Sequence, residues 1–121
     1  MANPFVHVEL NTTDLGKAKP FYTALFDWTL SAAPMGGGME YTMIGVGEGT
    51  GGGMMTHPMP GAPSMWLPYV LVADVKASTE KARSLGATIV REPMEVMDAG
   101  TLAIFLDPTG AALGLWQPKA S

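Results

Sequence analysis

The sequence contains no cysteine among its 121 residues. Disulfides, iron–sulfur clusters and zinc sites built on thiolates are therefore excluded. Charged residues are also scarce, at 15% of the chain, and the formal net charge is −4. The basic residues are not clustered, so the chain lacks a positive surface for a phosphate backbone and we expect no nucleic acid as a partner.

Long hydrophobic runs are missing as well. The longest nearly unbroken apolar stretch, residues 66–73, is far too short to span a bilayer, so no membrane partner is expected. Residues 1–10 lack the basic and apolar regions of a signal peptide, which favours a cytoplasmic protein. Hydrophobic residues make up 47% of the chain, enough for the core of a single domain covering residues 1–121.

An internal repeat organises what is present. Residues 4–58 align without a gap on residues 64–118 at a constant offset of 60, and Asp14 falls on Asp74. Between the two copies, residues 59–63 are rich in proline and glycine, as is typical of a linker. The repeat predicts two tandem modules joined by this linker.

Each copy has the pattern of a strand, a helix and further strands. Residues 5–12 alternate between apolar and polar side chains, which predicts a strand with one polar face that carries His7 and Glu9. Asp14 and Asp74 are good residues to begin a helix. Further strands are expected at residues 39–46, 52–56, 88–91, 101–106 and 112–117. The predicted fold is α+β, with two βαβββ modules forming a curved mixed sheet, helices outside and a cup inside.

Two motifs carry a family resemblance. The opening Phe5-Val-His7-Val-Glu9-Leu10 and the closing stretch from Phe105 to Pro118, with its Asp-Pro-Thr-Gly turn, resemble the vicinal oxygen chelate superfamily of glyoxalases, bleomycin resistance proteins and extradiol dioxygenases. The resemblance implies the paired βαβββ cup. It also implies, in the metal enzymes, one ligand from each of four strands around a divalent ion that acts as a Lewis acid. Other members of the superfamily bind drugs without a metal.

The ligand positions that the resemblance implies are mostly filled by residues that cannot bind a metal. The first is His7, whereas the third is Leu67 and the fourth Gly114, and the offset of 60 then gives Met54 as the second. One imidazole does not hold zinc, iron or manganese tightly. We therefore expect no metal and no other cofactor. A divalent metal at His7, with Glu9 as a second ligand, is the weaker alternative.

The same mapping predicts which side chains line the cup. The expected ligand-binding residues are apolar, aromatic or small, and suit a hydrophobic small molecule: Met54, Leu67, Tyr69, Gly114 and Trp116. Glycine at 114 would leave space for such a ligand. The competing interpretation is ordinary core packing.

His7 and Glu9 are the candidate catalytic residues, as an acid–base pair in which the carboxylate raises the pKa of the imidazole. The simpler alternative is that the two side chains only satisfy each other's hydrogen-bonding needs.

Three functions are compatible with these residues. The leading hypothesis is a glyoxalase-like protein, a homodimer with exposed Trp28 and Trp66 at its interface, that binds a hydrophobic small molecule in a metal-free cup. Such a protein either sequesters the molecule or acts on it with His7 and Glu9. The alternatives are a metal-dependent lyase or dioxygenase, though not a true lactoylglutathione lyase, and a non-catalytic structural or regulatory domain.

Overall fold

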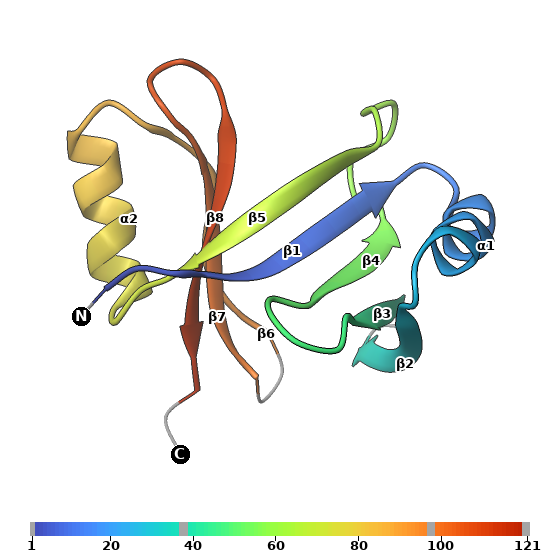
Figure 1. The fold of residues 1–121 in the computed structure, drawn as a ribbon. Coiled ribbons are helices and arrows are strands. Elements are labelled where there is room, and N and C mark those ends of the chain that lie inside the picture. The colour runs from blue at the N-terminus through green and yellow to red at the C-terminus, as the bar shows by residue number, and fades with distance from the viewer. Residues whose placement is uncertain (1, 37–38, 97–98, 120–121) are drawn as a thin grey trace. The chain divides into compact units, whose positions relative to one another are not determined.

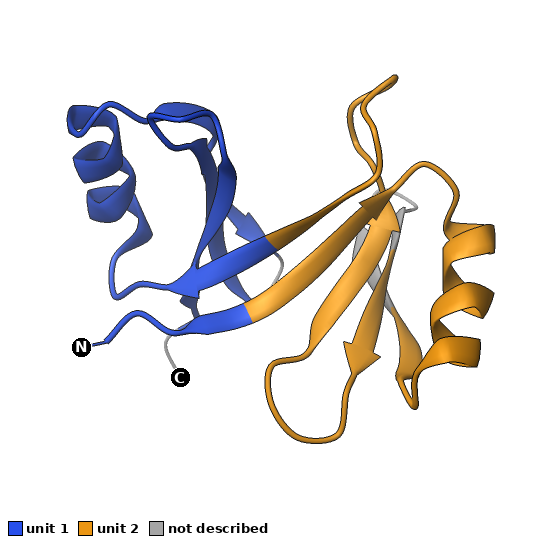
Figure 2. Ribbon diagram, turned by 45° about the horizontal axis from the view of Figure 1, so that its top comes forward, with its two compact units in different colours: residues 1–6, 68–121 blue, residues 7–67 orange. Residues whose placement is uncertain are grey.

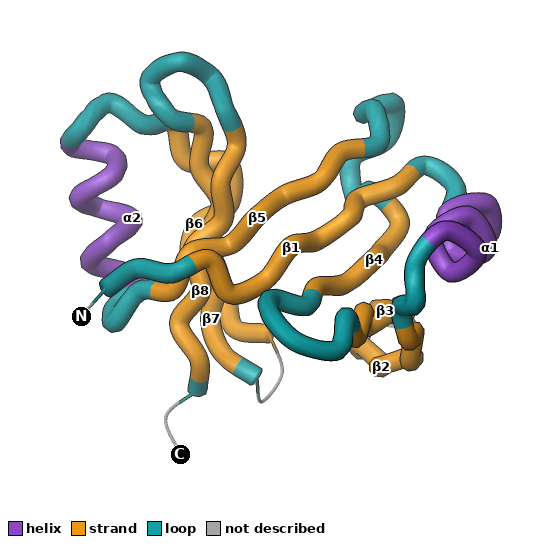
Figure 3. Tube along the Cα trace, viewed as in Figure 1, coloured by secondary structure: helices purple, strands orange, loops and turns teal. Residues whose placement is uncertain are grey.

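The computed structural model describes residues 2–36, 39–96 and 99–119. Two helices and eight strands follow one another in this part of the chain in the order βαβββ, βαβββ (Figures 1 and 3). This order confirms the α+β class and the two tandem modules. The elements are β1 (Phe5–Thr12), α1 (Leu15–Leu25), β2 (Thr29–Gly36), β3 (Met39–Gly45), β4 (Gly52–Thr56), β5 (Met65–Leu71), α2 (Val75–Ser84), β6 (Thr88–Val96), β7 (Gly100–Leu106) and β8 (Ala112–Pro118).

The chain divides into two compact units (Figure 2). Unit 2 comprises His7–Leu67, and unit 1 comprises Met1–Val6 with Pro68–Ser121. Within unit 2 the strand order is β2-β3-β4-β1, with β1 and β4 parallel and the other pairs antiparallel. Within unit 1 the order is β5-β8-β7-β6, with β5 and β8 parallel. Each unit therefore holds a mixed sheet, as predicted.

The sequence patterns missed one outer strand and part of another. β2 was not predicted at all, and β6 continues to Val96, past the predicted end at Arg91 and through Pro93. Both strands end the strand order of their unit, where only one side of the strand needs hydrogen-bond partners. Proline is tolerated in such edge strands, so a turn-like composition does not exclude them.

The core of unit 2 lies between its sheet and α1. Leu10, Ile44 and Met54 are buried there, and Ala18 and Tyr22 of α1 pack against them. Asp14 caps the start of the helix, as predicted: its Oδ1 accepts a hydrogen bond from the backbone N–H of Lys17 at 3.1 Å.

Only some of the apolar side chains of α1 contact the core. Ala18 and Tyr22 pack against the core, but Phe21 and Leu25 are 59% and 58% exposed. The helix therefore contacts the sheet along a narrow line.

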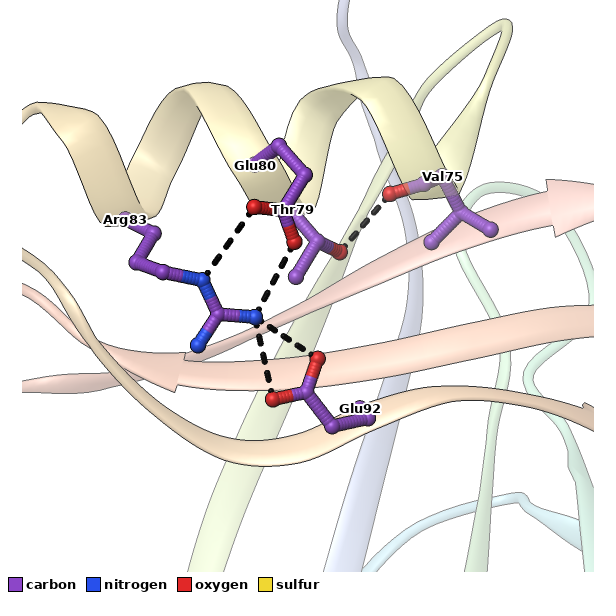
Figure 4. Close-up of polar contacts among 5 residues, drawn as sticks. All are labelled: Val75, Thr79, Glu80, Arg83 and Glu92. Carbon is purple, nitrogen blue, oxygen red and sulfur yellow. Dashed lines mark hydrogen bonds and ion pairs between the residues drawn. The ribbon is translucent and has the colours of Figure 1, made fainter.

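The core of unit 1 lies between its sheet and α2. Val72, Val75, Ala103 and Leu115 form it. On the outer surface, Arg83 of α2 contacts Glu80 at 3.0 Å and reaches Glu92 of β6 at 2.8 Å (Figure 4). These ion pairs are solvent-exposed, so most of the stability of this unit comes from the apolar contacts beneath them.

Neither helix in the described part of the chain has the length and hydropathy needed to cross a bilayer.

The Asp-Pro-Thr-Gly turn forms as predicted. Asp107 Oδ1 accepts hydrogen bonds from the hydroxyl of Thr109 at 2.6 Å and from its backbone N–H at 2.8 Å. The hydroxyl bond is the main reason why the pKa of the Asp107 carboxyl lies below its ordinary value. Gly110 completes the turn with φ of +94°.

Candidate functional site

Alternation along β1 separates a polar face from the core face of unit 2. Leu10 points into the core beneath α1, so His7 and Glu9 project from the opposite face of the sheet. Glu9 is only 8% exposed, which is unusual for a carboxylate. A buried carboxylate needs hydrogen-bond donors, and the structure supplies one from β3, which is separated from β1 by β4 in the sheet.

Tyr41 of β3 lies between the two predicted residues. Its hydroxyl oxygen is 2.6 Å from His7 Nε2, and it donates a hydrogen bond to Glu9 Oε1 at 3.0 Å. The His7 and Tyr41 rings are stacked, with centroids 6.1 Å apart. His7, Tyr41 and Glu9 thus form a hydrogen-bonded chain, which we call the relay.

The hydroxyl of Tyr41 fixes the positions of the protons in the relay. It has one hydrogen, which it donates to Glu9, so towards His7 its oxygen can only accept. His7 Nε2 therefore carries a hydrogen, and a neutral His7 has its lone pair on Nδ1.

Burial lowers the pKa of His7 from its ordinary value of 6.5, because the imidazolium loses hydration. The expected rise through a carboxylate neighbour is therefore wrong. Tyr41 lies between the imidazole and Glu9, and its hydroxyl is neutral, so the loss of hydration dominates. At neutral pH the relay accordingly holds a neutral imidazole at one end and a carboxyl group at the other.

The lowered pKa predicts how stability changes with pH. As the pH falls through about 6.5, His7 becomes protonated in the unfolded chain but remains neutral in the folded chain. Neutral His7 therefore contributes fully to the free energy of unfolding above that pH. This contribution is lost as the pH falls through the pKa of His7 in the folded protein. Urea midpoints from about pH 7.5 down to about pH 5 should therefore fall less in His7→Gln than in the wild type.

His57 supplies the control for this measurement. Its Nδ1 accepts a hydrogen bond from the backbone N–H of Met59 at 3.1 Å, in the turn after β4. His57→Gln should leave the pH dependence attributed to His7 in place. An unchanged slope in His7→Gln would contradict the assignment.

The strand registers correct one predicted site residue. Glu9 pairs with Gly53, and Tyr69, 60 residues after Glu9, pairs with Gly114, which is 61 residues after Gly53. The offset between equivalent residues of the two modules thus grows from 60 at the first strand to 61 at the last strand. Extra residues of the second module are accommodated at the two register irregularities between β6 and β7. A shift of one residue moves a side chain to the other face of a strand.

The equivalent of Gly114 in the first module is therefore Gly53. Met54, predicted to line the cup, is instead fully buried in the core with Leu10 and Ile44. Its side chain points towards α1, on the face of β4 opposite to Gly53.

The remaining predicted ligand-binding residues lie on β5 and β8. Leu67 and Tyr69 are each 3% exposed. In unit 1, Leu115 points into the core, so Gly114 and Trp116 belong to the face of β8 away from α2. The space expected at Gly114 is already filled, because a Cβ at this position would overlap the ring of Tyr69.

Aromatic side chains form a second surface in unit 2. The rings of Tyr22 and Trp28 are stacked with centroids 5.6 Å apart, and Tyr22 meets Trp66 edge-on at 5.5 Å. Trp66 remains 37% exposed. A shallow depression of about 400 Å³, lined in part by Tyr22, Thr12 and Ser64, lies beside them. The role of Trp28 and Trp66 in a homodimer stays a prediction.

A family model for the Glyoxalase/Bleomycin resistance protein/Dioxygenase superfamily matches residues 5–115. The chain belongs to this superfamily. The match spans both βαβββ modules and confirms the resemblance seen in the opening and closing motifs.

Two curated relatives of this chain are longer proteins. CFP32 of Mycobacterium tuberculosis (strain CDC 1551 / Oshkosh), whose name describes it provisionally as a glyoxylase, is 40% identical over 117 residues, or 91% of this chain and 44% of CFP32. The anthracycline biosynthesis protein DauV of Streptomyces sp. (strain C5) is 27% identical over 123 residues, or 90% of this chain and 45% of DauV. The chain thus spans less than half the length of these relatives.

Solved structures of the superfamily share the fold. Methylmalonyl-CoA epimerase from Mycobacterium tuberculosis superposes with a TM-score of 0.71 at 17% identity, covering 96% of this chain and 88% of the epimerase. At this identity the likeness concerns the fold alone.

The side chains of this superfamily member do not fit the metal that the fold implies. With the corrected register, the four positions are His7, Gly53, Leu67 and Gly114, and only the imidazole can donate to a metal. No group of three or more His, Asp or Glu side chains able to hold an ion occurs in the described ranges. We therefore derive no chemistry through a metal.

Proposed function

We propose that the chain is a metal-independent member of the superfamily that binds an aromatic or otherwise hydrophobic small molecule and exchanges a proton with it. The observation that carries this proposal is the Tyr41 hydroxyl, which contacts both His7 Nε2 and Glu9 Oε1. An acid–base function needs such groups in fixed positions and poor contact with water.

The relay has the composition for proton exchange. The neutral imidazole of His7 and the carboxylate of Glu9 are both bases, and Tyr41 links them by hydrogen bonds. Hydrogen bonds in a partly buried network strengthen one another, so the relay can share a proton that one of its members gains. Suitable ligands have a carbonyl with an acidic neighbouring C–H, or a phenol, because both lose a proton to bases of this kind.

The name of one relative supports a hydrophobic aromatic ligand. DauV is named as an anthracycline biosynthesis protein, and anthracyclines are flat polycyclic molecules with phenol and quinone groups. A compound of this class is therefore the first probe to use.

The test combines metal analysis with ligand titration on tag-free protein. We expect no stoichiometric metal after incubation with zinc, manganese, iron or nickel, and saturable quenching of tryptophan fluorescence by an anthracycline. Retained metal would favour the metal-dependent lyase or dioxygenase instead. A metal-free protein that binds neither an anthracycline nor smaller phenols and quinones would favour the non-catalytic domain.

A further inference from the structure

A tyrosine ring covers a glycine at equivalent positions of both modules. In unit 2 a Cβ added to Gly53 would overlap the ring and hydroxyl of Tyr41, and in unit 1 a Cβ on Gly114 would overlap the ring of Tyr69. Both glycines are buried in strands with ordinary backbone geometry. No turn or positive φ therefore requires glycine at either position, and the space taken by the ring is the remaining reason.

The ring in unit 2 reaches Gly53 from a diagonal position. Thr42 is opposite Met54 and Met43 is opposite Gly53 in the β3–β4 pairing, so Tyr41 lies two residues away along β3. Side chains of this length bridge such diagonal distances across a sheet. The three atoms nearest to the added Cβ are the hydroxyl oxygen, Cε2 and Cζ of Tyr41, which form the functional end of the ring.

We propose that Gly53 is a positioning residue for the proton relay. The missing side chain at position 53 lets the Tyr41 ring lie flat across β4, which brings its hydroxyl to His7 and Glu9. Any larger residue displaces the hydroxyl end of the ring and breaks both hydrogen bonds. Gly53 occupies a position that holds a metal ligand in the metal enzymes of the superfamily. Here the glycine makes room for the Tyr41 ring and does not leave an empty pocket.

This inference builds on the site of the proposed function, but its test needs no ligand. In the wild type, neutral His7 should hold its hydrogen on Nε2, because Tyr41 Oη accepts it. Nitrogen NMR of the imidazole reports that tautomer directly. In Gly53→Ala the preference of His7 for the Nε2–H tautomer should fall to the mixture of tautomers found in Tyr41→Phe. The double variant Tyr41→Phe/Gly53→Ala should show the same mixture as Tyr41→Phe alone.

Gly45→Ala is the matched control. It adds the same methyl group on the strand that carries Tyr41, and its Cβ meets only Thr29, at 3.6 Å from the carbonyl oxygen and 3.8 Å from Cβ. The His7 tautomer should stay as in the wild type. An unchanged tautomer in Gly53→Ala would overturn the proposal, whatever the outcome of ligand titrations.

A second comparison covers the case in which Gly53→Ala does not fold. Tyr41→Ala removes the ring that the added methyl group would strike. The double variant Tyr41→Ala/Gly53→Ala should then be as stable as Tyr41→Ala alone in urea unfolding. If the double variant also fails to fold, the loss comes from the backbone of β4, and Gly53 does not act through Tyr41.

Discussion

Gly52→Ala is expected to destabilise the protein by about 3 kcal/mol. A Cβ at this position would overlap the backbone carbonyl oxygen of Val8 and lie 3.0 Å from its carbonyl carbon. Val8 and Gly52 are partners in the parallel β1–β4 pair. A backbone group cannot rotate away as a side chain does, so β1 and β4 must separate and lose hydrogen bonds.

Urea unfolding of Gly52→Ala beside Gly45→Ala would check this expectation. The control adds the same methyl group in ordinary contact with Thr29 and should change stability by less than about 0.5 kcal/mol. Equal midpoints for the two variants would mean that β1 and β4 are not as closely apposed at Val8 as described.

Tyr41→Phe is expected to lower ligand affinity at least tenfold and to cost about 1.5 to 3 kcal/mol of stability. The variant keeps the ring over Gly53 but removes the hydroxyl that accepts from His7 and donates to Glu9. Glu9 is 8% exposed, so water replaces the lost donor poorly. The tenfold loss in affinity corresponds to about 1.4 kcal/mol.

Tyr22→Phe is the matched control for Tyr41→Phe. Tyr22 belongs to the same unit, and its ring packs against Trp28 and Trp66 on the helix side of the sheet. Its substitution should leave the affinity for an anthracycline probe unchanged. Fluorescence titration measures the affinity, and urea unfolding measures the stability. Equal affinities for both variants would remove Tyr41 from the binding site.

The sequence by itself determined the class and the first half of the site. The repeat and the caps at Asp14 and Asp74 predicted two βαβββ modules, because capping and alternation are local properties of the chain. The alternation of β1 also placed His7 and Glu9 on one polar face. The motif resemblance indicated the superfamily, which the family model then confirmed.

Only the tertiary structure brought Tyr41 to His7 and Glu9. These residues are 34 and 32 positions apart in the chain, and a strand's own pattern does not say which residues lie opposite it. Residues 41–44 of β3 show no regular alternation of apolar and polar side chains, so the sequence did not indicate which face of the strand carries Tyr41.

The register between strands was likewise beyond the sequence. A gapless repeat placed Met54 on the polar face, whereas one residue accommodated elsewhere in the module puts Gly53 there and Met54 in the core. Side chains alternate with a period of two, so one residue exchanges the faces completely. Sequence thus determined which residues could do chemistry, and strand pairing decided that a tyrosine ring over Gly53 joins them.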